Sequence, residues 1–141
     1  MTTEADIGHG IQVFLARPAA PTNWIKLAEV VDGAPPPINR DAVDATNHDS
    51  EDGYREYIGG LKGLGEMTVE TNLVPGSSQE QLLLESIADK KPWPMRYVFP
   101  NGAEVSFKQL CTNYEPAAPL EDKMTASSTH QPSGKPTWVE A

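Results

Sequence analysis

Cysteine is nearly absent from this chain, which carries Cys111 alone among 141 residues. A single thiol cannot form an internal disulfide, so a small disulfide-stapled fold is excluded and a reducing compartment is favoured. Histidine is also scarce, and His9, His48 and His130 stand too far from one another and from the cysteine for zinc-ligand spacing. We therefore predict no metal and no cofactor, and expect Cys111 to pack as a small residue in a strand.

Long apolar runs and basic residues are lacking as well. No apolar segment approaches the roughly 18 residues that span a bilayer, and the acidic start Met1–Asp6 does not resemble a signal peptide. The chain has 20 acidic against 11 basic residues, a net charge of −9. Conventional nucleic-acid binding needs clustered Lys and Arg, so it is disfavoured. An acidic surface that DNA passes without sticking remains compatible with this charge, as does a simple role in solubility.

Proline and glycine are abundant instead, at 13 and 11 residues. Such a composition favours a turn-rich β protein over a helical bundle. The length suits one domain over residues 1–141, with residues 1–10 as an amino-terminal arm.

Alternating apolar residues and turn signals predict the strands. The expected strands cover residues 11–15, 24–31, 67–73, 95–99, 104–114 and 123–129. Both faces of 24–31 are mostly apolar, which predicts a strand covered on both sides. Asn101-Gly102 predicts a tight hairpin, and a change of phase in 104–114 predicts a bulge near Lys108-Gln109. A turn is expected over 132–136, followed by a short tail.

One helix is predicted over residues 78–91. Ser77 followed by Glu80 has the spacing of a capping box, and Pro92 prevents continuation. The apolar stripe is expected to consist of Leu83, Leu84, Ile87 and Ala88. With no alternating βαβ rhythm, the expected fold is mainly β: a β-sandwich or flattened barrel of about six to eight strands with one flanking helix.

The stretch from residue 33 to residue 60 has no usable period and is predicted to be a long mobile loop. A connection of this length inside a compact domain is usually functional or disordered. Aromatic residues among charges favour ordering against a partner, so we interpret the segment as an assembly loop. Its expected contact residues are Arg40, Asp41, His48, Asp49, Tyr54, Arg55 and Tyr57.

Other interpretations stay open at this point. The glycine-rich segment 59–65 lacks the Gly-Lys-Ser/Thr end of a phosphate loop and is expected to be a bend. A carbohydrate- or small-ligand-binding β-sandwich module would use exposed aromatics such as Trp93 and Trp138. An enzyme would use scattered acids such as Asp49 and Glu56, although no catalytic residues are predicted.

The order and spacing of several short motifs resemble the major tail tube protein of long flexible-tailed bacteriophages. These motifs are Trp24–Val30, Pro36-Pro37, Asp44–His48, Arg55–Leu61, Gly65–Asn72, the single helix and Ser133–Pro136. The resemblance implies a structural, non-enzymatic virion protein with the fold expected above, made in the host cytoplasm and placed in the tail. It further implies hexameric rings that stack into a tube, with the long loop ordered between rings.

The same resemblance implies the partners, which would be other copies of the chain, the tape-measure, tail-tip and terminator proteins, and genomic DNA passing through the lumen without specific binding. No membrane partner is implied. Within the strand 67–73, Met67, Val69, Thr71 and Leu73 are expected to face inward. Glu70 then faces outward, and we take it as a candidate for the wall of the lumen.

Overall fold

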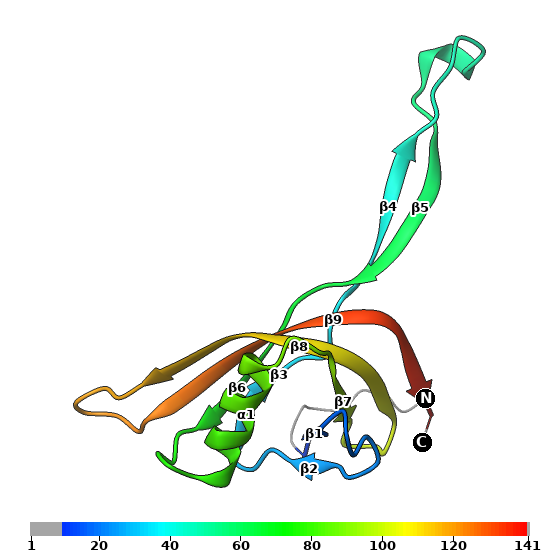
Figure 1. The fold of residues 1–141 in the computed structure, drawn as a ribbon. Helices are drawn as coiled ribbons and strands as arrows, with labels where there is room; N and C mark the ends of the chain where they lie inside the picture. Colours follow the sequence, from blue (N-terminus) through cyan, green and yellow to red (C-terminus); the bar gives the residue numbers. More distant parts are fainter. Residues whose placement is uncertain (1–9, 141) are drawn as a thin grey trace, which may run out of the picture.

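A computed structural model describes residues 10–140, so residues 1–9, nine of the ten residues of the expected amino-terminal arm, lie outside the described part. The described chain is mainly β, with one α-helix (Figure 1). The elements are β1 (Gln12–Leu15), β2 (Ile25–Lys26), β3 (Val30–Gly33), β4 (Ile38–Asp44), the 3-10 turn η1 (Glu51–Gly53), β5 (Tyr57–Leu64), β6 (Met67–Asn72), α1 (Ser78–Ala88), β7 (Trp93–Val98), β8 (Glu104–Ala117) and β9 (Thr125–Val139). Over this range, no helix is long and apolar enough to cross a membrane.

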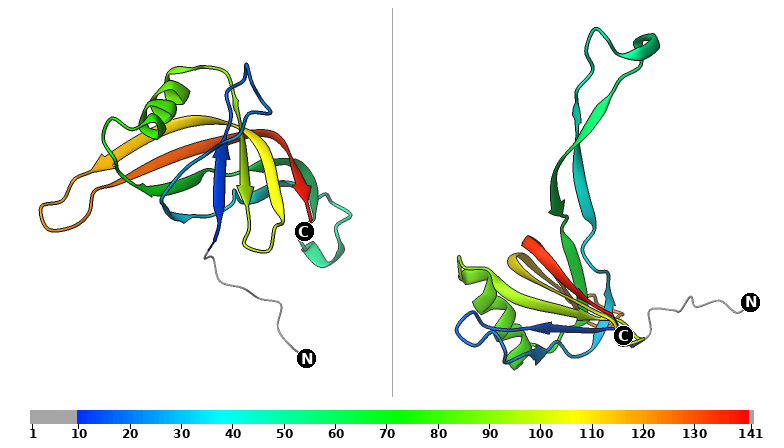
Figure 2. Two further views of the ribbon diagram at one scale, coloured as in Figure 1. Left: turned by 90° about the horizontal axis from the view of Figure 1, so that it is seen from below. Right: turned by 90° about the vertical axis from the view of Figure 1, so that its right-hand side faces the viewer.

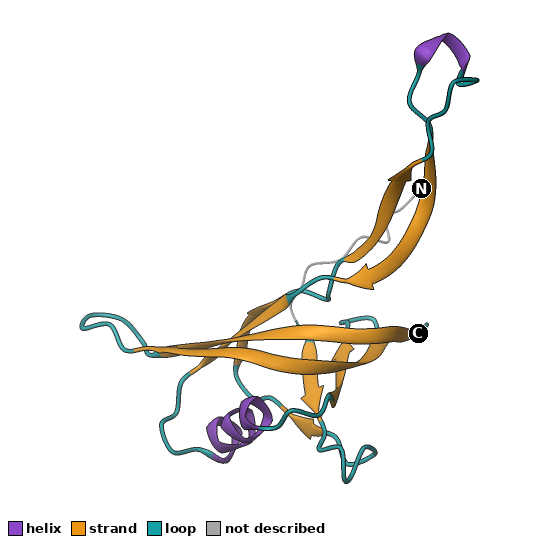
Figure 3. Cartoon of the chain, turned by 45° about the horizontal axis from the view of Figure 1, so that its top comes forward, coloured by secondary structure: helices purple, strands orange, loops and turns teal. Residues whose placement is uncertain are grey.

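Seven strands form one curled sheet in the order β2-β1-β7-β8-β9-β6-β3, with antiparallel pairing throughout. The sheet bends into a half-barrel, and α1 lies on its concave side (Figure 3). Strands β4 and β5 form a separate two-stranded sheet that projects away from this body. The mainly β fold with one flanking helix is thus confirmed as a curled sheet plus a hairpin.

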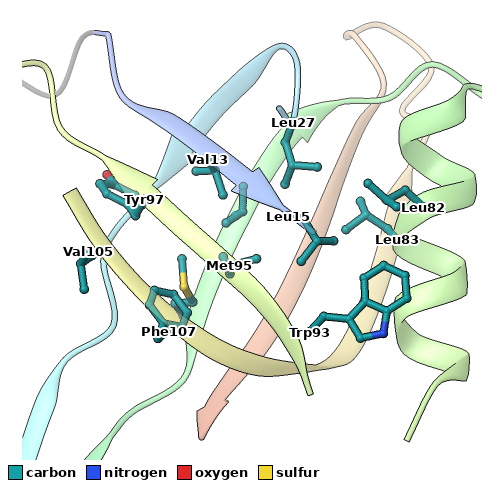
Figure 4. Close-up of a cluster of buried hydrophobic side chains, with 12 residues drawn as sticks. Val13, Leu15, Leu27, Leu82, Leu83, Trp93, Met95, Tyr97, Val105 and Phe107 are labelled. Carbon is teal, nitrogen blue, oxygen red and sulfur yellow. The ribbon is translucent and has the colours of Figure 1, made fainter. Parts of the chain in front are cut away.

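The core fills the concave side of the sheet (Figure 4). Side chains from β1, β6, β7 and β8 meet those of α1, with the Trp93 ring close to the helix. The buried cluster consists of Val13, Leu15, Leu27, Met67, Val69, Leu82, Leu83, Trp93, Met95, Tyr97, Val105 and Phe107. Strict alternation in β6 and β7 places every second residue in this cluster, as the sequence predicts for Met67 and Val69.

The hairpin between β7 and β8 is confirmed, with Gly102 at φ +95° in its turn. The register between β8 and β9 does shift next to Lys108, but the extra residues there belong to β9, whereas the bulge is predicted on β8. Burial alternates without a break from Val105 through Gln109 to Cys111, so there is no phase change at Lys108-Gln109. On β8 the extra residue is Thr112, because the register with β9 shifts between Cys111 and Asn113. The sequence does not reveal this alternation of buried residues, because the polar residue Gln109 occupies one of the buried positions.

The expected single strand over residues 24–31 is wrong. The chain there forms the two-residue β2 and the four-residue β3, which lie at opposite edges of the sheet. Glu29 between them has φ +54°, a left-handed conformation that ends an extended run. Gln79 of α1 then binds both backbone groups of Ala28, at 2.7 Å to its N–H and 3.3 Å to its carbonyl.

Helix α1 begins as predicted, with the Ser77 hydroxyl accepting a hydrogen bond from the backbone N–H of Glu80 at 3.3 Å. It ends at Ala88, three residues earlier than expected, so no lysine lies in its last turn. The predicted apolar stripe is also wrong in part. The helix buries Leu82, Leu83 and Ser86, while Leu84, Ile87 and Ala88 are exposed.

Strand β9 runs from Thr125 to Val139, through the segment 132–136 where a turn is predicted. The turn residues form a bulge instead. Ser106 of β8 pairs with Thr137, and Lys108 pairs with Ser133. Between these two pairs β9 therefore contains two more residues than β8. Gly134, at φ +85°, supplies the left-handed conformation that this bulge needs.

Candidate assembly site

The segment predicted as a loop without regular structure is a β-hairpin with an ordered pairing register. Strand β4 pairs antiparallel with β5 from Ile38 opposite Leu64 to Asp44 opposite Tyr57, with one irregularity after Arg40. The hairpin extends well beyond the curled sheet in Figure 1 and in the right-hand view of Figure 2. No residue of either strand is buried. This hairpin has no core of its own.

Glycines in β5 and directly after it allow side chains of β4, and of the residue before β4, to lie across the hairpin. A Cβ at Gly59 would sit 2.8 Å from Nη1 of Arg40, and a Cβ at Gly65 would sit 2.6 Å from Cγ of Pro37. Such distances are shorter than van der Waals contact, so larger residues would displace these side chains. The glycine-rich segment expected to be a bend is therefore mostly strand, and its glycines serve close packing.

Polar contacts order the tip of the hairpin. Ser50 Oγ donates to Glu56 Oε2 at 2.9 Å, and Arg55 Nη1 lies 3.2 Å from Asp44 Oδ2. Hydrogen bonding by Thr46, with a smaller contribution from Arg55, lowers the pKa of Asp44. The carboxylate of Asp44 is thus charged over the whole neutral range.

The structure gathers all seven residues predicted for the interface onto this hairpin, and each is exposed. Arg40 and Asp41 lie on β4, whereas His48 and Asp49 lie in the tip. Tyr54 and Arg55 follow η1, and Tyr57 begins β5. Whether these side chains contact a partner remains a prediction.

Sequence reasoning recognised only part of the apolar component of the hairpin, namely its tyrosines. Six of the fourteen exposed large hydrophobic residues in the described chain lie here: Ile38, Val43, Tyr54, Tyr57, Ile58 and Leu61. Val43 pairs with Ile58 across the strands, and Leu61 is 83% exposed. An exposed apolar group of this size is typical of an interaction surface. The available signal was the strand-forming pattern Tyr57-Ile58 before the glycines, which was attributed to a loop.

Glu70 lies on the convex face of the curled sheet, as predicted, and is half-buried. Directly opposite on neighbouring strands are Asp32 of β3 and Ser127 of β9, and Ser127 is in turn opposite Glu115 of β8. The flanking rows hold Thr68, Thr129 and Asn113 on one side and Asn72, Thr125 and Ala117 on the other. Three carboxylates and no base therefore occupy these rows.

A polar network lies inside the core. His130 Nδ1 is 2.7 Å from Gln109 Oε1, and its Nε2 is 2.9 Å from Ser128 Oγ. Because the amide oxygen only accepts, Nδ1 carries the proton and the Ser128 hydroxyl donates to Nε2. Burial lowers the pKa of His130 to about 4, so the imidazole is neutral. The complete burial of His130 makes this a structural network.

The remaining candidates for chemistry find little support. Cys111 is buried, as predicted, and burial raises the pKa of its thiol. Between residues 10 and 140 there is no group of three or more His, Cys, Asp or Glu placed to hold a metal ion. Asp49 and Glu56 lie on the exposed tip. Trp93 is 2% exposed, so the aromatic platform proposed for a carbohydrate-binding module is wrong at this residue.

Several solved structures with the same fold come from tail or tube assemblies. A chain of the tail of an empty GTA (gene transfer agent) particle superposes with a TM-score of 0.80 at 15% identity, covering 96% of this chain and all of the other. The SPP1 tail tube gives 0.72 at 11% identity, with 95% and 78% covered. The baseplate of the anti-feeding prophage gives 0.74 at 8% identity, with 99% and 97% covered.

No curated protein sequence gives a significant match. The profile of the lambda phage tail tube protein family, in contrast, matches residues 9–139, nearly the whole chain. This match agrees with the curled sheet, the single helix and the projecting hairpin. The chain belongs to the lambda phage tail tube protein family and is a structural protein of the virion tail.

Proposed function

We propose that this protein polymerises as hexameric rings that stack into the tail tube, the conduit for DNA ejection into the host. The observation that carries the proposal is an exposed, partly apolar hairpin on an otherwise well-packed body that has the tail tube fold. Similar chains come from a tail with C6 symmetry and from a baseplate with 6-fold symmetry. This role requires no catalytic step.

The hairpin is the part that links one ring to the next. Its length takes it beyond the body, where a neighbouring ring can cover its apolar residues and its charged residues can pair. Arg40, Asp41, His48, Asp49, Tyr54, Arg55 and Tyr57 are the proposed contact residues. Ordering a surface that is already hairpin-shaped costs less entropy than ordering a free loop, which supports this assignment.

The convex face of the sheet forms the lumen wall in this proposal. Glu70 and its neighbours Asp32 and Glu115 would repeat six times around the bore. At about 0.15 M salt the screening length is ~8 Å, so these carboxylates still repel DNA close to the wall. The placement of α1 on the opposite, concave side leaves this face of the sheet uncovered by helix.

Further partners are tail components. Structurally similar chains occur in a sheath and tube terminator and in a tube-terminating cap, which supports contacts with a terminator protein here. Contacts with tape-measure and tail-tip proteins, and passage of genomic DNA without specific binding, are proposed from the tail tube role.

Electron microscopy of the purified full chain tests the proposal. At high concentration, or with a tail-initiating complex, we expect rings or hollow tubes of six-fold symmetry. Protein that stays monomeric beside an active initiating complex would overturn the proposed function.

In assembled tails, Glu70→Lys should leave tubes intact but slow DNA ejection, with the defect easing as salt rises. Thr68→Lys places a lysine on the same face one row away from Glu70. Comparing the ejection rates of the two variants shows how strongly the defect depends on the position of the charge.

A further inference from the structure

A groove of about 910 Å³ lies between the second half of β9 and the base of the β4–β5 hairpin. Its lining residues are Ile38, Lys62, Gly63, Leu64, Gln131, Pro132, Ser133, Gly134, Lys135, Pro136 and Trp138. The only charged residues among them are Lys62 and Lys135. In a chain with nearly twice as many acids as bases, this groove is locally basic.

Apolar side chains in the groove are incompletely covered. Trp138 is 50% exposed, although one of its faces stacks on Phe99 with ring centroids 6.4 Å apart. Ile38 on the other wall is 56% exposed. A large aromatic with one face covered and one face open is a common anchor at protein interfaces. The groove therefore fits an apolar side chain flanked by negative charge.

The loop between β8 and β9 has that chemistry. It forms the tip of the long β8–β9 hairpin, which extends past the rest of the sheet (Figure 1). Leu120 at this tip is 98% exposed, the largest value among the exposed hydrophobic residues of the described chain. Glu121 and Asp122 follow it directly and are exposed. This tip is an apolar side chain followed by two carboxylates.

The tip cannot reach the groove of its own chain. Both features are built on β9, the tip before Thr125 and the groove from Gln131 onward. At about 3.4 Å per residue, the ten residues from Thr125 to Lys135 cover roughly 30 Å of extended strand. Pairing with β8 along this length keeps the strand extended. An occupant with this chemistry must therefore come from another molecule.

We propose that Leu120 of one copy docks in the β9–hairpin groove of the next copy around the ring, with Glu121 and Asp122 facing Lys62 and Lys135. The two surfaces differ and lie at separate ends of one β-hairpin, so the contact is head-to-tail and is repeated until the ring closes. Burial of an apolar side chain supplies affinity, and the charges fix the orientation. This inference rests on the proposed ring and adds its lateral contact.

A substitution at the tip tests the apolar part. Leu120→Ser should leave the melting temperature of the monomer unchanged, because the side chain is free in the monomer. It should raise the protein concentration needed for assembly about tenfold or more, since each lost contact recurs around the ring. Ala118→Ser in the same loop is the matched control and should assemble like the unmodified chain. Normal assembly of Leu120→Ser would overturn the docking.

Charge reversal tests the orientation. Glu121→Lys with Asp122→Lys should weaken assembly, and so should Lys62→Glu with Lys135→Glu. The combination of all four in one chain should restore assembly, because each acid–base pairing is re-formed with its sign exchanged. If the combined variant is no better than either pair, the two surfaces do not face each other.

A cross-link locates the contact directly. In assembled tubes, Leu120→Cys with Ser133→Cys should give, on mild oxidation, a ladder of covalent oligomers ending at six chains, and neither single variant should do so. Tubes that form without this ladder would overturn the docking and leave the tube function standing. Two other occupants of the groove would also overturn the docking and leave the tube function standing. One is the hairpin tip of a stacked ring, shown by a disulfide between Ser133→Cys and Tyr54→Cys. The other is the segment 1–9. Failure of the unmodified chain to form rings would overturn the proposed function itself.

Discussion

The curled body and the β4–β5 hairpin differ in how their strands are stabilised. In β7, every second side chain is buried, and Trp93, Met95 and Tyr97 all join one core. In β4, not one side chain is buried, although its backbone pairs with β5 from Ile38 to Asp44 with a single irregularity. A two-stranded hairpin alone is marginal in water, so its stability depends on what covers it. We therefore expect the body to determine whether the chain folds, and we propose that the hairpin is needed for folded chains to associate.

A core substitution should produce the largest change in stability. Trp93 is buried against α1, and its Nε1 donates to Asp89 Oδ2 at 2.9 Å. Trp93→Ala should lower the free energy of unfolding by about 3–5 kcal/mol, because it leaves a large cavity and removes the hydrogen bond to Asp89 Oδ2. Denaturant unfolding followed by circular dichroism measures this change.

Trp138→Ala is the matched control for Trp93→Ala. This tryptophan is half-exposed, so its removal should cost clearly less. Equal losses from the two substitutions would contradict the difference in packing between the core and the surface of the body.

Acid should destabilise the body through His130. Burial lowers the pKa of His130 from 6.5 to about 4. Between these two pH values the imidazole is protonated in the unfolded chain and neutral in the folded chain. The contribution is fully present above pH 6.5 and is lost as the pH falls from 6.5 toward 4, amounting to about 3 kcal/mol at most. Unfolding free energies measured at several pH values should show this slope.

Two histidine variants separate this effect from other titrations. His130→Gln should lower stability at neutral pH but flatten the slope between pH 6.5 and 4. His48→Gln, on the exposed hairpin tip, should keep the slope of the unmodified chain. A slope that survives His130→Gln would assign the acid sensitivity to other groups.

Substitutions on the hairpin should change stability least. Leu61 is 83% exposed, so Leu61→Ser should alter the free energy of unfolding by no more than about 0.5 kcal/mol. The same change should impair tube formation, since the leucine is proposed to be covered by a neighbouring ring. Lys62→Ser next to it is unsuitable as a control because Lys62 lines the lateral groove, so Asn39→Ser on β4 serves instead.

Local signals predicted the parts of the fold that depend on neighbouring residues. The Ser77 cap, the turn at Asn101-Gly102 and the alternation in β6 all follow from short-range rules that the core also satisfies. The break at Glu29 did not follow, because Gln79 of a distant helix holds the backbone of Ala28 there.

The hairpin was harder to predict than the core because solvent covers both of its faces. Without burial there is no alternation, and the polar run Asn39-Arg40-Asp41 gives no strand signal. Its position and its role as an assembly element were predicted from length and composition. Its exposed apolar residues were only partly recognised, since Ile38 and Leu61 stand apart among polar and glycine residues. The same reasoning missed the second part of β9, where Pro132–Pro136 has a turn composition within a long strand.

Removal of the hairpin tests the separation of folding from assembly most directly. Residues 39–63 can be replaced by Asn-Gly between the paired Ile38 and Leu64, which keeps the 3.0 Å hydrogen bond from Gln131 Nε2 to the Leu64 carbonyl. The shortened chain should melt cooperatively within about 5 °C of the full chain and should form no tubes under conditions in which the full chain does. Loss of cooperative melting, or tubes built from the shortened chain, would contradict the account.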